Sequence, residues 1–145
     1  MITDANLQLS TAQPVTGSSV SQNAIDMGAY ISAMQPLHVA FAVDTSVTAS
    51  GSATVAFQVI SSASPDLSSP TVLNSSGAIG KAELTIGRAP IVVGASLNTV
   101  PAGHRYIGAQ YLVATGPLTA GAFTAMPIDD SSASALLYPS GFSVY

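Results

Sequence analysis

Alternation of large and small side chains constrains the fold of this chain more than any other feature. Residues 37–43 carry large apolar side chains at the odd positions and small or polar ones between them, and residues 54–60 repeat the pattern. Neighbouring residues of a strand point to opposite faces, so each run places its large side chains on one face of a sheet. We expect two strands, joined as an antiparallel hairpin by the Gly-containing loop around residues 50–52.

Further short apolar runs separated by turn residues predict an all-β protein. The 12 Gly and 9 Pro interrupt the chain about every seven residues, and no long stretch has helical periodicity with capping residues. The expected fold is an antiparallel β-sandwich, a jelly roll, with little helix beyond a short helix or turn at residues 29–34. The remaining expected strands are residues 6–9, 24–27, 71–73, 83–86, 90–94, 105–115 and 121–128.

The C-terminal residues form a segment distinct from the expected sandwich domain of residues 1–130. Ser-rich stretches at 61–69 and 131–134 are typical of loops or linkers, and the second leads into an apolar ending. Disordered ends are usually polar, so this segment is expected to pack on its own domain or on another protein. Its candidate interface residues are Leu136, Leu137, Tyr138, Phe142 and Tyr145.

Charged residues are scarce, which limits the partners that the chain can bind. They make up 7% of the sequence, with a net charge of −4 and only Lys81, Arg88 and Arg105 as fixed cations. Binding to nucleic acid or to an anionic membrane requires clustered cations, so neither is expected. The 21 Ser and 12 Thr leave a surface suited to extensive protein contacts. We expect neither a secretory signal nor a membrane span, and the sequence contains no cysteine.

Hydrolytic and phosphate-binding motifs are incomplete. His38 and His104 are the candidate bases for a catalytic triad, but no Ser lies in a Gly-x-Ser-x-Gly motif. His38 is expected to be structural on the minor face of a strand, and His104 to lie in a turn. Residues 77–81 resemble a phosphate-binding loop only in their Gly-Lys pair, and we expect a turn there that leads into a strand. We therefore expect that the protein is not an enzyme and that it has no catalytic residue and no cofactor.

Metal and sugar sites have little support in the sequence. Asp129 and Asp130 are adjacent and would point to opposite faces of a strand, and joining them to Asp44 or Asp66 gives no calcium-loop pattern. We expect no metal site. A jelly-roll lectin is a weaker alternative, because the chain lacks Trp and its Tyr106 and Tyr111 belong to an expected strand.

Six segments, in order along nearly the whole chain, share features with the corresponding segments of a known family, among them residues 4–16, 21–28 and 105–113. Together they resemble a family of capsid cement (decoration) proteins of tailed bacteriophages. Residues 25–28, Ile-Asp-Met-Gly, are similar to a common Ile-Asp-Leu-Gly, and residues 105–106 resemble the Arg-Tyr strand of the family. The chain differs in having Asp130 followed by two serines where the family often has Gln. The segments that carry the resemblance are residues 4–16, 21–28, 67–73, 105–113, 119–125 and 138–142.

The resemblance implies a jelly roll that sits as a homotrimer on the outer surface of the virion. Such a protein, made in the host cytoplasm, would bind the major capsid protein of the expanded phage head and stabilise the shell without covalent chemistry. The family has no catalytic residues to carry over. Two alternatives stay open, namely another virion module such as a head fibre, spike or tail component, and a jelly-roll carbohydrate-binding domain.

Overall fold

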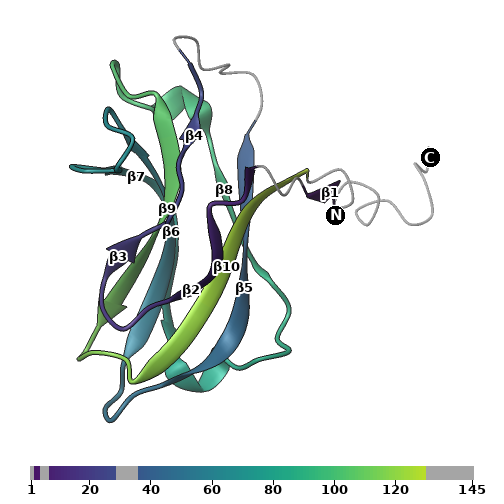
Figure 1. The fold of residues 1–145 in the computed structure, drawn as a ribbon, viewed down its shortest axis with the longest axis vertical. Helices are drawn as coiled ribbons and strands as arrows, with labels where there is room; N and C mark the ends of the chain where they lie inside the picture. The colour runs from purple at the N-terminus through teal and green to yellow at the C-terminus, as the bar shows by residue number, and fades with distance from the viewer. Residues whose placement is uncertain (1, 4–6, 29–35, 130–145) are drawn as a thin grey trace, which may run out of the picture.

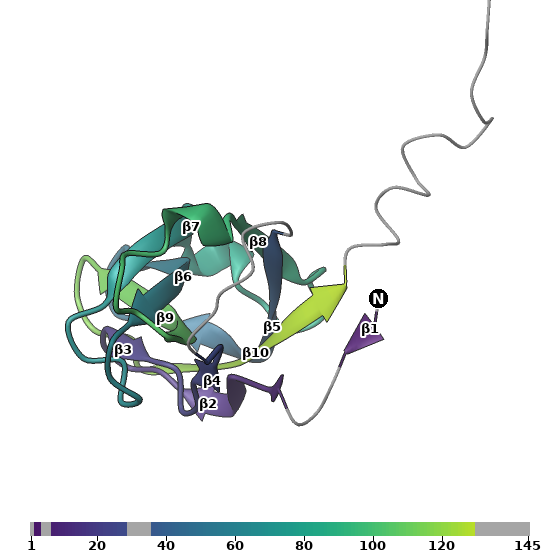
Figure 2. The same ribbon diagram turned by 90° about the horizontal axis from the view of Figure 1, so that it is seen from above.

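The computed structural model describes residues 2–3, 7–28 and 36–129, and these residues form two five-stranded antiparallel sheets packed face to face (Figures 1 and 2). One sheet has the order β1-β10-β5-β8, and β2 pairs with β10 beside this path. Its strands are β1 (Ile2–Thr3), β2 (Ser10–Pro14), β5 (Leu37–Thr48), β8 (Ile91–Ala95) and β10 (Ala120–Asp129).

The second sheet has the order β3-β9-β6-β7, and β4 also pairs with β9. Its strands are β3 (Ser19–Val20), β4 (Ile25–Asp26), β6 (Thr54–Ser62), β7 (Thr71–Gly80) and β9 (Tyr106–Ala114). Two short 3₁₀ helices, Lys81–Glu83 and Leu97–Thr99, lie in the connections on either side of β8. The strand order and the small helical content confirm the predicted jelly-roll sandwich.

The predicted hairpin between the two alternating runs is wrong. The run at residues 37–43 lies in β5, which pairs with β10 and β8, whereas the run at 54–60 lies in β6, which pairs with β7 and β9. The connection at residues 49–53 therefore crosses from one sheet to the other. Both runs bury their large side chains in the space between the sheets, so the same alternation fits facing sheets as well as a hairpin.

Other predicted strands match the structure to different degrees. The runs at 90–94, 105–115 and 121–128 correspond to β8, β9 and β10, while 71–73 is only the start of the longer β7. The strand predicted at 6–9 begins instead at Ser10, and only two residues of 24–27 form β4. Residues 83–86 are not a strand, because the chain turns there through a 3₁₀ helix. The element predicted at 29–34 lies outside the described residues.

Four aromatic rings from both sheets form the centre of the core. Phe57 of β6 lies 5.1 Å from Phe41, 5.0 Å from Phe123 and 5.9 Å from Tyr111, measured between ring centroids. Tyr111 also stacks on Phe123 at 5.3 Å. All four side chains are at most 1% exposed. Because each ring comes from a different strand, this cluster ties β5 and β10 to β6 and β9.

A loop covers part of the outward face of the second sheet. Residues 63–70 leave β6 and fold back so that Leu67, with φ 59°, is buried at 2% exposed. A Cβ built on Gly108 of β9 would lie 2.3 Å from Cδ1 of Leu67 and 3.1 Å from Oγ of Ser21. Ser62 holds the loop by donating a 2.6 Å hydrogen bond to the carbonyl of Ser68. Gly108 is therefore needed for close packing of this loop.

We expect the substitution Gly108→Ala to lower the free energy of unfolding by about 1–3 kcal/mol, because its methyl group overlaps Leu67 and forces the loop outward. The matched control is Gly80→Ala, since a Cβ at Gly80 meets no atom within 4 Å and φ there is −67°. Urea unfolding of both variants measures the difference. Equal midpoints for the two variants would show that the loop moves away without cost.

Candidate functional site

The outward face of β8, β5 and β10 presents uncharged side chains on neighbouring strands. Strand pairing sets Val92 and Met126 on either side of Ala40, and sets Gly94 and Ile128 on either side of His38. Val92 is 45% exposed, whereas Ala40 between its neighbours is 5% exposed. We call this surface the β8–β5–β10 face. It consists of Val92, Ala40, Met126, His38, Ile128 and Ala42.

Two contacts lie at the two ends of this face along β5, one at His38 and the other just beyond Ala42, at Asp44. The ring of His38 lies over Gly94, where an added Cβ would come within 3.0 Å of the imidazole. This position confirms that His38 belongs to the minor face of its strand. Farther along β5, Asp44 accepts a 2.5 Å hydrogen bond from Thr124 of β10. On the outward side of β5, the residue that follows Ala42 is the charged Asp44.

The outward face of the opposite sheet is different in character. Strand pairing sets Gln58 beside Gln110, and Ala56 beside Leu112, which is 43% exposed. The loop of residues 63–70 covers another part of this face. The two outward faces thus differ: that of β8, β5 and β10 carries mostly small and apolar side chains, whereas that of the second sheet is more polar and is partly covered by the loop of residues 63–70.

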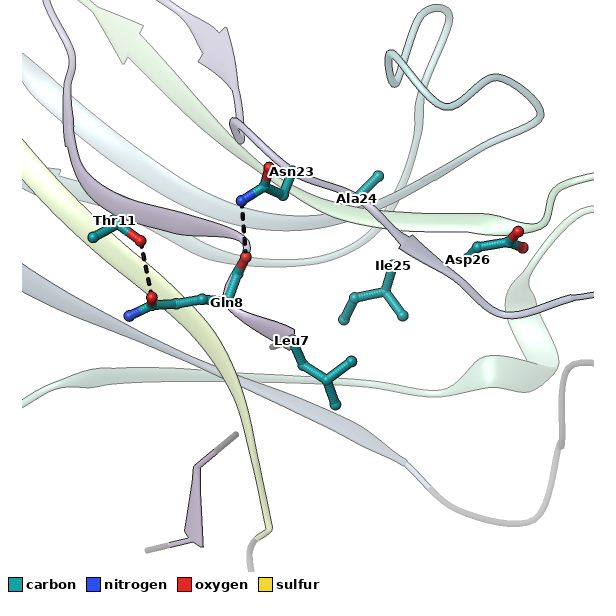
Figure 3. A pocket seen from close by; sticks show the side chains of 7 residues that line it. All are labelled: Leu7, Gln8, Thr11, Asn23, Ala24, Ile25 and Asp26. Carbon is teal, nitrogen blue, oxygen red and sulfur yellow. Dashed lines mark hydrogen bonds between the residues drawn. The ribbon is translucent and has the colours of Figure 1, made fainter. Parts of the chain in front are cut away.

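A pocket of about 370 Å³ lies where β2 and the segment leading into β4 come together (Figure 3). The hydroxyl of Thr11 donates to Oε1 of Gln8 at 2.9 Å, and Nδ2 of Asn23 donates to the carbonyl of Gln8 at 3.2 Å. These bonds connect Gln8 with Thr11 and Asn23 on the walls of the pocket. It is lined by Leu7, Gln8, Thr11, Asn23, Ala24, Ile25 and Asp26.

An exposed ion pair borders this pocket. Arg105 donates to both carboxylate oxygens of Asp26, at 2.7 and 2.6 Å, and its guanidinium carbon lies 5.5 Å from the centre of the Tyr106 ring. The hydrogen bonds from Arg105 and from the backbone of Gly28 hold the pKa of Asp26 below its ordinary value. The same pair raises the pKa of Arg105. The contact joins β4 to the start of β9, and solvent screening keeps its contribution to stability small.

The structure brings one histidine against a serine. Nδ1 of His104 lies 2.9 Å from Oγ of Ser61 in a hydrogen bond whose donor depends on the tautomer. Ser61 is fully buried, and no carboxylate is hydrogen-bonded to His104 within the described part of the chain. His104 follows a turn, as predicted, and its backbone N–H donates to Pro101. This pair supports the packing of β6 against the 101–104 turn and lacks the orienting acid of a triad.

The remaining sequence candidates are dispersed in the fold. Residues 77–80 end β7 rather than forming a turn before a strand, and Nζ of Lys81 donates to the carbonyl of Ala49 at 2.6 Å. Asp66 accepts from the backbone of Ser68, which lowers the pKa of Asp66. Asp129 ends β10, and Asp130 lies outside the described residues. Within the described ranges, no three His, Cys, Asp or Glu residues are grouped to hold a metal ion.

The structure neither supports nor contradicts the C-terminal interface prediction, because its five residues lie outside the described ones. They are Leu136, Leu137, Tyr138, Phe142 and Tyr145. Across the ranges that the structure does describe, no helix is both long and apolar enough to span a membrane. Sequence reasoning missed the β8–β5–β10 face, although the small or polar residues at the even positions of 38–42 indicate its β5 part.

Comparison with known proteins places the chain in a family. A search of curated proteins finds no match. The sequence does match the profile of the family described as Bbp16, whose name is phage-derived, over residues 9–126. The matched range begins just before β2 and ends within β10, so it includes nearly all of both sheets. The chain therefore belongs to the Bbp16 family.

Proposed function

We propose that the protein is a capsid cement protein of a tailed phage, which binds the expanded head as a homotrimer and stabilises it without covalent chemistry. The observation that carries the proposal is the match to a phage-derived family over residues 9–126. The ordered resemblance to cement proteins along the sequence supports the finer assignment. The partners are then the major capsid protein and two further copies of the chain, and the site of action is the outer surface of the virion.

The surface of the sandwich has the properties that such a role requires. A cement protein must bury part of its surface against other proteins, and burying Lys or Glu there costs desolvation and side-chain entropy. The β8–β5–β10 face presents Val92, Ala40 and Met126, three uncharged residues that lie opposite one another on neighbouring strands. Three equivalent contacts in a trimer then raise avidity without a strong single contact.

The test is cosedimentation of purified protein with expanded and unexpanded phage shells that lack it. We expect saturable binding to expanded shells only, and a raised resistance of those shells to heat or chaotrope, because a ligand of one state stabilises that state. Val92→Lys places a charge in the uncharged face and should weaken binding at least about tenfold. The matched control Leu112→Lys changes a residue of similar exposure on the other sheet, and its binding should stay within about twofold.

Other results would assign a different role. Saturable binding without gained resistance would favour another virion module, such as a fibre or a spike. Absence of binding to every shell form, combined with binding on a glycan array, would favour the carbohydrate alternative, for which the pocket with Gln8, Thr11 and Asn23 offers hydroxyl-binding groups. Labelling of the protein in virions, viewed by electron microscopy, separates a shell position from a tail position.

A further inference from the structure

We propose that the pocket beside β2 and β4 is a binding site for one ring of a neutral sugar, either free or at the end of a glycan. This activity goes beyond the proposed function and does not depend on it, because the pocket shares no residue with the β8–β5–β10 face. The pocket volume of about 370 Å³ lies at the lower end of the range of small-molecule sites, about 300–1,000 Å³. A space of this size suits a single ring better than a longer chain.

Hydrogen bonds between two segments of the chain form this pocket before any ligand binds. The N–H of Asn23 donates to the carbonyl of Leu9 at 2.9 Å, and the N–H of Thr11 donates to Oε1 of Gln22 at 3.1 Å. Behind them, Oε1 of the buried Gln13 accepts from the N–H of Gln22 at 3.1 Å. These bonds fix β2 against the segment that leads into β4. A preformed site loses less conformational freedom when it binds a ligand.

The amide groups of the lining fit sugar hydroxyls. Oε1 of Gln8 accepts from the hydroxyl of Thr11, and Nδ2 of Asn23 donates to the carbonyl of Gln8. The other ends of these two amides, Nε2 of Gln8 and Oδ1 of Asn23, are bonded to no group among the residues that the structure describes. One is a donor and the other an acceptor, and a hydroxyl group can serve both.

Apolar side chains form another part of the lining. In Figure 3, the side chains of Leu7 and Ile25 lie between Gln8 and Asp26. Leu7 is 42% exposed, so its side chain is accessible to a ligand. A sugar ring carries C–H groups between its hydroxyls, and these gain free energy by packing on apolar atoms. The lining therefore combines the two kinds of contact that a sugar ring needs, a few polar groups and an apolar wall.

The charges at the edge of the pocket favour a neutral ligand over an ion. Both carboxylate oxygens of Asp26 accept from Arg105, and Oδ1 also accepts from the N–H of Gly28 at 2.9 Å. A cationic ligand would have to compete with Arg105 for this carboxylate. An anionic ligand would be repelled by the carboxylate and by a chain whose net charge is −4. A neutral sugar meets neither obstacle.

NMR titration of the isotope-labelled full-length chain tests the site. The probes are the methyl glycosides of glucose, galactose, mannose and N-acetylglucosamine. We expect at least one of them to shift the backbone amide signals of Thr11, Asn23 and Ile25 saturably. The dissociation constant should be on the order of 1–10 mM, as expected for a ligand of about a dozen non-hydrogen atoms.

Two substitutions remove one kind of contact each. Gln8→Met keeps the length of the side chain but deletes its amide, and it should raise the dissociation constant at least about fivefold. Leu7→Ala shortens the apolar wall without removing a side-chain hydrogen bond, and it should raise the constant at least about threefold. Leu7→Ala also keeps the test valid if Gln8→Met fails to fold.

The matched control is Gln58→Met, the same substitution at a partly exposed glutamine of β6 that does not line the pocket. Its dissociation constant should stay within about twofold of the unsubstituted chain. The absence of a saturable shift with all four glycosides would overturn the site. Equal weakening by Gln8→Met and Gln58→Met would overturn it as well.

A glycan array that carries the same four sugars as terminal units separates the two sources of the ligand. Binding to the array as well as in solution supports the end of a glycan, and binding in solution alone supports the free sugar. Shell binding is measured separately by cosedimentation, so failure of the sugar site and failure of the cement role are distinguishable.

Discussion

Phe57→Ala is expected to lower the free energy of unfolding by about 3–5 kcal/mol, the range found for removal of a buried aromatic side chain. Phe57 is fully buried and contacts three other rings, two from the opposite sheet, so its removal leaves a cavity at the junction of both sheets. A domain of this size is stable by roughly 5–15 kcal/mol, so the loss is a large share of the total. The midpoint of thermal unfolding should fall by on the order of 10 °C.

Urea unfolding at one fixed protein concentration measures the loss and separates it from effects of assembly. Leu112→Ala is the control, because Leu112 is 43% exposed and surface truncations usually change stability by less than about 0.5 kcal/mol. Phe57→Leu keeps most of the volume and should lie between the two. A loss below about 1 kcal/mol for Phe57→Ala would mean that the four rings do not form the centre of the core.

Strands with strong alternation could be predicted from the sequence because alternation reports the burial of one face. β5, β6 and β9 were expected from this signal, and β10 from its apolar residues after a Gly-Pro break. Which strands pair could not be predicted, since facing sheets and hairpins both bury the same side chains. Alternation predicts the class of fold, whereas the pairing of the strands depends on long-range contacts such as that of Phe41 with Phe57.

Short strands escaped prediction for a different reason. β3 comprises only Ser19 and Val20 and is held by its pairing with Tyr111 and Gln110 of β9, so its own composition carries no strand signal. The strand at residues 10–14 was placed too early, because Ala12 sits at φ 44° and its N–H donates to the Thr124 side chain, an irregularity invisible to periodicity. Tertiary contacts, not local preference, decide these elements.

The candidate site was less predictable than the fold. The small or polar residues at positions 38, 40 and 42 predict only the minor face of a strand, whereas the pairing of β5 with β8 and β10 places Val92 and Met126 beside them. The pairing of Ser61 with His104 also could not be foreseen, because 43 residues separate the two along the chain. Which side chains share a surface depends on the register of the paired strands, and this register could not be predicted from the sequence.

Tyr111 gives the core a group that responds to alkaline pH. Its ring is fully buried, and burial raises the pKa of Tyr111 to about 12, with the carboxylate of Asp44 adding to the rise and Ser10 opposing it. The hydroxyl of Ser10 donates to Gln13 at 2.7 Å, and no well-formed hydrogen bond to the Tyr111 hydroxyl is present among the described residues. The fold therefore holds a neutral phenol that the unfolded chain would ionise near pH 10.

Stability should accordingly fall as the pH rises above 10. Below that pH both states keep the proton and the contribution is fully present; between pH 10 and about 12 only the unfolded chain loses it. The free energy of unfolding then drops by about 1.4 kcal/mol per pH unit, a total of about 2–3 kcal/mol.

Tyr111→Phe should remove this alkaline loss of stability. Because the substitution deletes a buried hydroxyl without a good partner, it should leave the free energy of unfolding at pH 7 nearly unchanged. Tyr106→Phe, at a partly exposed position on the same strand, should keep the alkaline loss. Urea unfolding from pH 7 to 12 measures all three chains, and an unchanged alkaline loss in Tyr111→Phe would place the titrating group elsewhere.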